Sequence, residues 1–261
     1  MNHHSGTKAA ITGGTQGLGF AIAKRLIEEG ARSVAICGRN REKGEAAATL
    51  LRNDTDAKVV FVQTDLSNPD AAVGFITKAI ETFGGLNALV NSAGLTTRGG
   101  LLDTDLATWE AHMAVNLRAP FLTMQTAVRY MKATGIPGSI VNIISMTALC
   151  GQSYLTPYSV AKGGLSTLTK NVANAFAADR IRCNGVLTGW METPGEALTQ
   201  KMFHGAGDDW AERAGKTLPM GKLVQPDELA GLVAYMLSPE SGVMTGALVE
   251  YDQVVSGAYP E

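Results

Sequence analysis

The chain has 261 residues, of which 45% are hydrophobic and 18% charged, with a formal net charge of −2 and an isoelectric point of about 6.1. With 30 glycines and 9 prolines, this composition indicates a globular, glycine-rich protein of one large α/β domain or two small ones, rather than a disordered chain. A charge so close to neutral gives no electrostatic reason to expect nucleic acid or an anionic membrane surface as a partner. We therefore expect a small-molecule substrate.

Membrane insertion and secretion are not expected. Residues 133–161 carry no charge, but glycines and prolines interrupt them and they are rich in Ser, Thr and Asn, so they cannot form a continuous apolar helix. The N-terminus lacks a basic region followed by an apolar run, which argues against a secretory signal. We expect a cytoplasmic protein.

The cysteines and the N-terminal histidines give no sign of a metal site. The three cysteines share no metal-ligand spacing and are expected to be free thiols: Cys37, Cys150 and Cys183. His3 and His4 are adjacent, but a solvated chain end explains them more simply than a metal-binding pair. No bound metal is expected.

Short β-branched runs alternate with longer amphipathic stretches along the chain. Strands are predicted at residues 8–14, 33–39, 58–65, 87–94, 138–145, 181–189 and 246–252. Helices are predicted at residues 18–30, 41–53, 71–84, 105–132, 155–178 and 225–237. This order is typical of an α/β fold in which a parallel sheet is covered on both faces, here a single doubly wound domain over residues 1–261. Ligands then bind where the strands end.

One segment departs from the alternation. Residues 191–222, before the last predicted helix, are rich in Met, Trp, Gly and charge. An insertion at this point of the chain lies over the carboxyl edge of the sheet, so we predict that it forms a lid.

A glycine-rich stretch, "TGGTQGLG", joins the first predicted strand to the first helix. Glycines at this junction let the backbone approach a pyrophosphate, and the helix N-terminus offers amide donors. A tight turn with no ligand is the alternative. The residues assigned to phosphate binding are Gly13, Thr15, Gln16, Gly17, Leu18 and Gly19.

The ends of the second and third strands bear on the choice of dinucleotide. Gly38 occupies the position at which an aspartate would bind the adenosine ribose, and Arg39 follows it. Because arginine binds phosphate well, NADP(H) is favoured over NAD(H), unless Arg39 is only a solvated charge or stacks on the adenine. Asp65 and Leu66 are assigned to the same site. Asp65 could accept a hydrogen bond from the adenine amino group or cap the following helix.

Tyr158 and Lys162, in "YSVAK", are four residues apart in a predicted helix, so their side chains lie on one face. They could be a surface pair or could carry out proton transfer.

Five motifs occur in a familiar order: "TGGTQGLG", "NSAG" at residues 91–94, Asn116 in "AVNLRAP", Ser145 in "NIISMTA", and "YSVAK". In this the chain resembles the classical short-chain dehydrogenase/reductase family over essentially its whole length. The resemblance implies a Rossmann-type sheet of about seven strands, NAD(P), exchange of a secondary alcohol and a carbonyl, and a homotetramer or homodimer. Ser92 is a minor departure from the usual pattern. Thr188 and a missing "DGG" are larger ones, which leave the substrate and the subunit contacts open but not the chemistry.

The resemblance also implies roles for individual residues. Tyr158 would exchange the proton, with its pKa lowered by the Lys162 ammonium and the oxidised nicotinamide. Ser145 would hydrogen-bond the substrate oxygen, and Asn116 would hold a water of the proton relay, unless it only packs. The remaining residues implied in cofactor binding, with Tyr158 and Lys162, are Asn91, Ala93, Gly94, Gly189 and Thr193.

The substrate-side residues are predicted from their position in the chain: Arg98, Thr147, Gln152, Tyr154, His204, Trp210 and Arg213. Their polarity favours a hydroxyl-rich or anionic substrate, and thus a sugar, sugar-acid or polyol dehydrogenase, including oxidation of a sugar hemiacetal to a lactone. A reductase of 3-oxoacyl thioesters or other ketones is the first alternative. A regulator that senses the dinucleotide without turnover is the second. The tail at residues 254–261 is expected to pack across a subunit interface.

Overall fold

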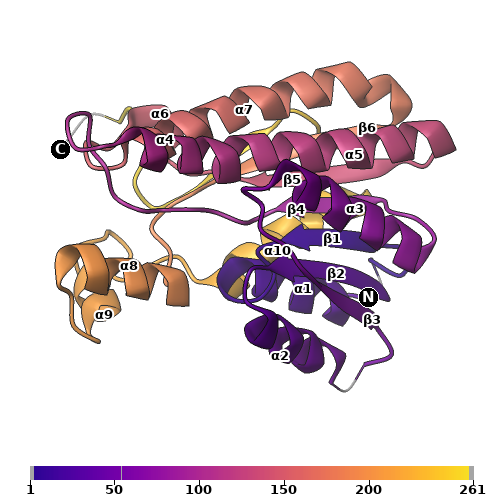
Figure 1. Ribbon diagram of the computed structural model, residues 1–261, viewed down its shortest axis with the longest axis horizontal. Helices are drawn as coiled ribbons and strands as arrows, with labels where there is room; N and C mark the ends of the chain where they lie inside the picture. Colours follow the sequence, from indigo (N-terminus) through magenta and orange to yellow (C-terminus); the bar gives the residue numbers. More distant parts are fainter. Residues whose placement is uncertain (1–2, 54, 259–261) are drawn as a thin grey trace.

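The computed structural model describes residues 3–53 and 55–258 and has an α/β architecture built on one sheet (Figure 1). Seven parallel strands lie in the order β3-β2-β1-β4-β5-β6-β7. Their bounds are β1 Lys8–Thr12, β2 Ser33–Gly38, β3 Lys58–Gln63, β4 Ala88–Asn91, β5 Gly138–Ile143, β6 Ile181–Thr188 and β7 Leu248–Tyr251. This sheet confirms the predicted fold. The strand order reverses between β1 and β4, where ligands bind in folds of this kind.

Helices cover both faces of the sheet. One core contains the apolar sides of α1 (Gly17–Glu28), α2 (Arg41–Arg52) and α10 (Pro226–Leu237). The other contains those of α3 (Pro69–Phe83), α5 (Ala119–Thr134) and α7 (Thr156–Phe176). In Figure 1, α1 and α2 lie in the lower part of the picture and α5 and α7 along its upper side. Because apolar surface is buried on both faces, the central strands are almost wholly inaccessible to solvent.

The predicted helix at 105–132 is divided into three parts. It consists of α4 (Leu106–Met113), a π-helical turn (Ala114–Arg118) and α5, which continues to Thr134. Pro120 has no N–H, so it cannot donate to the carbonyl of Asn116 four residues earlier. Next to it, the N–H of Ala119 donates to the carbonyl of Ala114, five residues earlier, which is the spacing of a π-helix. The wider turn therefore arises from the proline and contains Asn116.

The segment at 191–222 forms two short helices, α8 (Pro194–His204) and α9 (Trp210–Gly215), outside the two main helical layers (Figure 1). They have a small apolar cluster of their own, centred on Trp210, Ala214 and Leu223. A further short helix, α6 (Thr147–Cys150), was not predicted from the sequence. It directly follows the Ser145 motif.

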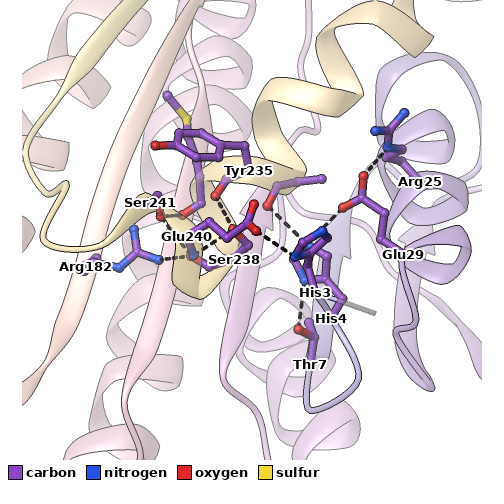
Figure 2. Close-up of polar contacts among 12 residues, drawn as sticks. His3, His4, Thr7, Arg25, Glu29, Arg182, Tyr235, Ser238, Glu240 and Ser241 are labelled. Carbon is purple, nitrogen blue, oxygen red and sulfur yellow. Dashed lines mark hydrogen bonds and ion pairs between the residues drawn. The ribbon is translucent and has the colours of Figure 1, made fainter. Parts of the chain in front are cut away.

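The N-terminal histidines belong to the fold, contrary to the expectation of a solvated end (Figure 2). His4 is fully buried, with Nδ1 2.9 Å from Thr7 Oγ1 and Nε2 3.1 Å from the carbonyl oxygen of Ala234 in α10. His3 lies 2.9 Å from Glu240. Burial lowers the pKa of His4, so this ring is neutral in the folded protein near neutral pH.

Cys37 and Cys183 are buried and Cys150 is exposed, and all three are free. Within the described residues, no helix is long and apolar enough to cross a lipid bilayer. The tail is irregular from 254 to 258, and residues 259–261 of the predicted interface segment lie outside the described part of the chain.

Candidate active site

A cavity of about 920 Å³ opens at the carboxyl ends of the strands around the β1–β4 reversal. Its walls come from the loops after β1, β2, β3, β4, β5 and β6, and from α7 and α8. Thr12, the last residue of β1, joins two of these loops, because its Oγ1 accepts from the N–H groups of Ser92 and Ala93 at 3.0 and 3.1 Å. This contact holds Ala93 and Gly94, both predicted, in the wall.

The glycine-rich loop forms one end of the cavity with its backbone. Gly13 has φ +69°, and a Cβ there would lie 2.8 Å from Cα of Ala93. A Cβ on Gly19 would lie 2.4 Å from the carbonyl oxygen of Gly13, so both positions require glycine. Helix α1 begins at Gly17 with no side-chain cap, which leaves its first amide groups available to an anion. All six predicted phosphate-binding residues line the cavity, and this loop fits a pyrophosphate.

Gly38 and Arg39 lie next to this loop. A Cβ on Gly38 would lie 2.8 Å from Cγ2 of Thr15, so the Thr15 side chain takes the space in which an aspartate at position 38 would begin. Arg39 lines the cavity, and among the described residues it forms no ion pair. A cation without a fixed partner at this place fits an additional phosphate.

Asp65 and Leu66 also line the cavity. The Asp65 carboxylate accepts from the N–H and the hydroxyl of Ser67 at 2.9 and 2.8 Å, and these bonds lower its pKa. Helix α3 is capped by Asn68 instead, through bonds from Asp70 and Ala71. The alternative of Asp65 as helix cap is therefore wrong.

Ser145, Tyr158 and Lys162 converge on the inner part of the cavity. Ser145 follows β5, and its Oγ accepts from the N–H of Thr147 at 3.2 Å. Lys162, one turn after Tyr158 in α7, is 3% exposed and donates to the carbonyl of Ile143 at 2.7 Å. Its Nζ lies 5.7 Å from the centre of the Tyr158 ring. Lys162 is buried and Tyr158 is partly buried, and both line the cavity, so they are not a surface pair.

Burial is the largest influence on the pKa values of Tyr158 and Lys162. It raises the pKa of Tyr158 to about 12, although a hydrogen bond with Ser145 acts in the opposite direction. It lowers the pKa of Lys162 to about 8. The pKa of Tyr158 is thus raised in the protein without its cofactor, and the lowering expected from Lys162 together with an oxidised nicotinamide is not seen in the absence of that nicotinamide.

Two predicted asparagines lie behind the cavity wall and not in it. Asn116 is fully buried, and its amide bonds both the N–H and the carbonyl of Leu95 at 2.9 Å. Asn91, 2% exposed, donates to Asn142 at 2.9 Å and accepts from Thr123 at 2.7 Å. The polar side-chain atoms of Asn91 thus bind β5 and α5, and Asn91 does not line the cavity with its side chain.

The substrate-side residues fall into two groups. Five line the cavity: Arg98, Thr147, Gln152, Tyr154 and His204. Two do not. Trp210 is 8% exposed and packs in the apolar cluster of α9, and Arg213 points to solvent, where it pairs with Asp209 one turn earlier. Neither side chain therefore lines this cavity, because the apolar side of α9 packs with Leu223.

Arg98 is the centre of a polar network that joins the loop after β4 to α8. It donates to Glu196 at 3.3 Å, to Nε2 of His204 at 3.1 Å and to the carbonyl of Thr96 at 3.0 Å. Both members of the Arg98–Glu196 pair are largely buried, with 13% and 15% of their side chains exposed. Glu196 and Arg98 lie close enough to Tyr158 to raise and lower its pKa, respectively.

Glu196 was not among the site residues predicted from the sequence. It also accepts from Trp190 and Gln200, at 3.0 and 2.7 Å. Its backbone N–H donates to the predicted Thr193, which caps α8 and lines the cavity, as does Gly189. The "TPGE" run is a capping-box pattern, so the start of a helix here, with an acidic residue in its first turn, could have been predicted.

Comparisons with known proteins indicate one family. The family model described as enoyl-(acyl carrier protein) reductase matches residues 13–253. Cis-4-hydroxycyclohexanecarboxylate dehydrogenase of Sinomonas cyclohexanicum is 31% identical over 94% of this chain and 94% of its own. The NADP-dependent (R)-specific alcohol dehydrogenase of Lentilactobacillus kefiri is 34% identical over 97% and 96%. L-rhamnose 1-dehydrogenase (NAD(P)(+)) of Azotobacter vinelandii is 32% identical over 93% of each chain.

Other relatives, at 30 to 32% identity, are named 3-oxoacyl-(acyl-carrier-protein) reductase and come from Chlamydia species. Among solved structures, a short-chain type dehydrogenase/reductase from Mycobacterium marinum superimposes with a TM-score of 0.86 at 28% identity. That similarity covers 96% of this chain and 95% of the other. Fold, site and relatives together show that the chain belongs to the short-chain dehydrogenase/reductase family of NAD(P)-dependent oxidoreductases.

Proposed function

We propose that the protein is a dehydrogenase of a sugar, sugar acid or polyol, which interconverts a secondary alcohol or hemiacetal and its carbonyl with NAD(P). The observation that carries this proposal is the polar wall formed by Arg98, Glu196 and His204, with Gln152 and Tyr154 beside it. Such a wall presents both donors and acceptors within a partly buried cavity. Neighbouring hydroxyl groups of one substrate can satisfy both kinds.

The proposed chemistry separates a hydride from a proton. NAD(P), when bound, supplies the hydride acceptor or donor. In oxidation, the Tyr158 phenolate takes the hydroxyl proton while the carbon–oxygen double bond forms, and in reduction the Tyr158 phenol returns that proton to the oxygen. Ser145 would hydrogen-bond the same oxygen and stabilise its developing charge. Lys162, buried beside the Tyr158 ring, would favour the phenolate when protonated.

The raised pKa of Tyr158, about 12, bears on the direction of this chemistry. Without ligands the phenol is protonated at neutral pH, which suits the acid needed for carbonyl reduction. Alcohol oxidation needs the phenolate, and the positive charge of an oxidised nicotinamide is the added influence that would lower the pKa.

The ion pair at the wall narrows the proposed substrate class. Glu196 already balances the charge of Arg98, and two further N–H groups of Arg98 donate to His204 and to the carbonyl of Thr96. A carboxylate on the substrate would have to displace Glu196 and leave it unpaired in a partly buried place. An uncharged sugar or polyol is therefore favoured over a sugar acid.

For the cofactor, we propose a preference for NADP(H) over NAD(H). Arg39 lines the cavity next to Gly38, and the Thr15 side chain fills the space an acidic residue would need. Both features support a 2′-phosphate over a bare ribose.

Reduction of 3-oxoacyl thioesters remains the second candidate, because the family model and several relatives are named for acyl-carrier-protein reductases. Its proton chemistry is the same. An acyl chain, however, would meet the Arg98–Glu196 pair in this cavity. A regulator without turnover would not need Ser145, Tyr158 and Lys162 at one cavity. Because all three line the same cavity, an enzyme is favoured over such a regulator.

A panel assay tests the proposal. The purified protein is mixed with NAD or NADP and with aldoses, polyols, sugar acids and simple alcohols, while the absorbance of the reduced nicotinamide is followed. Turnover of an uncharged sugar or polyol, faster with NADP, is the expected result. Turnover of 3-oxoacyl thioesters with NADPH and of no sugar would overturn the substrate class, and cofactor binding without any turnover would point to the regulator.

A further inference from the structure

A second buried histidine, His112, lies next to the proposed proton carrier and has no role in the chemistry above. It belongs to α4 and is fully buried. Its ring meets the Tyr158 ring edge to face, with centroids 6.3 Å apart and planes at 79°. The Tyr158 ring therefore packs directly against an imidazole.

The hydrogen bonds of His112 determine its protonation state. Its Nδ1 lies 3.1 Å from Nδ2 of Asn116, one helical turn later. An amide nitrogen only donates, so Nδ1 must accept, and the hydrogen of a neutral ring must be on Nε2. That nitrogen lies 2.9 Å from Oγ1 and 3.1 Å from the carbonyl oxygen of Thr97, where it donates.

These bonds link His112 to the cavity wall. Asn116 uses its other amide hydrogen and its oxygen on the backbone of Leu95, and His112 binds Thr97. Between them lies Thr96, whose carbonyl accepts from Arg98. The two side chains thus hold residues 95–97, and Leu95 and Thr96 line the cavity.

We propose that neutral His112 is a positioning residue for proton transfer at Tyr158, and that its protonation disables the site. This inference rests on the proposed function. The ring fixes one face of Tyr158 and, through Asn116 and Thr97, the loop that presents Arg98. A sequence signal exists in the H-x3-N spacing of "HMAVN", which places His112 and Asn116 on one helical face.

Protonation would break this arrangement for two reasons. A hydrogen on Nδ1 would face the donor Nδ2 of Asn116, and a buried charge would have no acidic partner. Tyr158 is the titratable side chain that α7 places against His112, with Lys162 beside Tyr158, and no charged side chain is among the influences on the pKa of His112. Burial lowers the pKa of His112, partly offset by the bond to Thr97, which agrees with a neutral ring at neutral pH.

The test compares two variants over pH 5 to 9, using whichever alcohol or carbonyl the panel identifies. His112→Phe removes every hydrogen bond of the ring, so kcat should fall by about tenfold or more while the KM for the dinucleotide stays within about twofold. His112→Asn places an acceptor near the position of Nδ1 but cannot become charged. We expect the original protein to lose kcat at low pH as His112 becomes protonated. His112→Asn should keep most of kcat and should not show this loss.

Two kinetic results would overturn the inference: unchanged kcat in His112→Phe, or the same acid-side decline in His112→Asn. If His112→Phe does not fold, the tautomer decides the question. Nitrogen-15 labelling of the histidine rings should show one neutral ring with its hydrogen on Nε2 that disappears in His112→Asn. A ring with its hydrogen on Nδ1, or one charged at pH 7, would refute it. This measurement needs no substrate, so it separates failure of the inference from failure of the proposed function.

Discussion

The two halves of the cavity are built in different ways. The half that we propose for the dinucleotide, called the cofactor half, contains residues 13–19, 38–39 and 64–67, and backbone geometry shapes it, with glycines where a Cβ would collide. The half that we propose for the substrate, called the substrate half, contains residues 96–98, 147–154 and 190–204, and side chains shape it. One of its hydrogen bonds joins residues 106 positions apart, between Arg98 and His204. The first half is thus specified locally, whereas the second exists only once distant segments have met.

Tyr158 lies where the halves meet, and its substitution should have the largest effect. Tyr158→Phe removes the proton carrier and leaves the ring, so kcat should fall by about 10³-fold while dinucleotide affinity changes little. Steady-state kinetics and cofactor titration measure both. Tyr235→Phe is the matched control, since it removes an exposed phenol of α10 that does not line the cavity and should retain most of kcat. Activity near the original level in Tyr158→Phe would refute the proposed chemistry.

A change in the cofactor half should leave the substrate half untouched. Arg39→Ala should weaken NADP(H) binding by about 10- to 100-fold and NAD(H) binding hardly at all, because only the former carries the 2′-phosphate. Fluorescence titration with each reduced cofactor gives the two affinities. Arg41→Ala changes a neighbouring exposed arginine and should affect neither. Equal losses for both cofactors in Arg39→Ala would mean that the arginine does not read the phosphate.

Glu196→Gln changes the substrate half and should leave the cofactor half untouched. It should raise the KM of an uncharged substrate by about tenfold without changing that of the dinucleotide, because Arg98 loses its balancing charge. A substrate with a carboxylate should gain relative to its uncharged counterpart. Glu212→Gln removes an exposed carboxylate of α9 that pairs with Lys216, and should change neither KM. An increase in the dinucleotide KM for Glu196→Gln would show that the halves are coupled.

The smallest effect is expected far from both halves, at His4. Its pKa is lowered in the folded protein, so the unfolded chain binds the proton more readily. The contribution of His4 to the free energy of unfolding should therefore be constant above the ordinary histidine pKa of about 6.5 and should decrease as pH falls below it. Urea unfolding of the protein and of His4→Gln at pH 7.5 and 5.5 measures this difference. A His4→Gln variant with the same dependence on pH would assign the decrease to another group.

Local features of the sequence were sufficient for much of the fold and for one half of the site. The alternation of strands and helices predicted the seven-stranded sheet, and "TGGTQGLG" predicted a loop that the structure places in the cavity. Tyr158 and Lys162 were paired by helical spacing alone. These features depend on neighbours in sequence, through the helical repeat, glycine geometry and chain order, and so could be read without a structure.

The remaining features required the folded chain. No local pattern shows that Trp210 packs with Ala214 and Leu223, or that Glu196 pairs with Arg98. Both contacts depend on how α8 and α9 are oriented relative to the rest of the fold. Burial likewise decided the pKa of Tyr158 in the protein without its cofactor, whereas the resemblance implies a lowering by Lys162 and an oxidised nicotinamide together. The sequence by itself determined the family and its chemical groups. Only the tertiary structure decided which groups face the cavity and with what charge, because burial and long-range pairing depend on the whole fold.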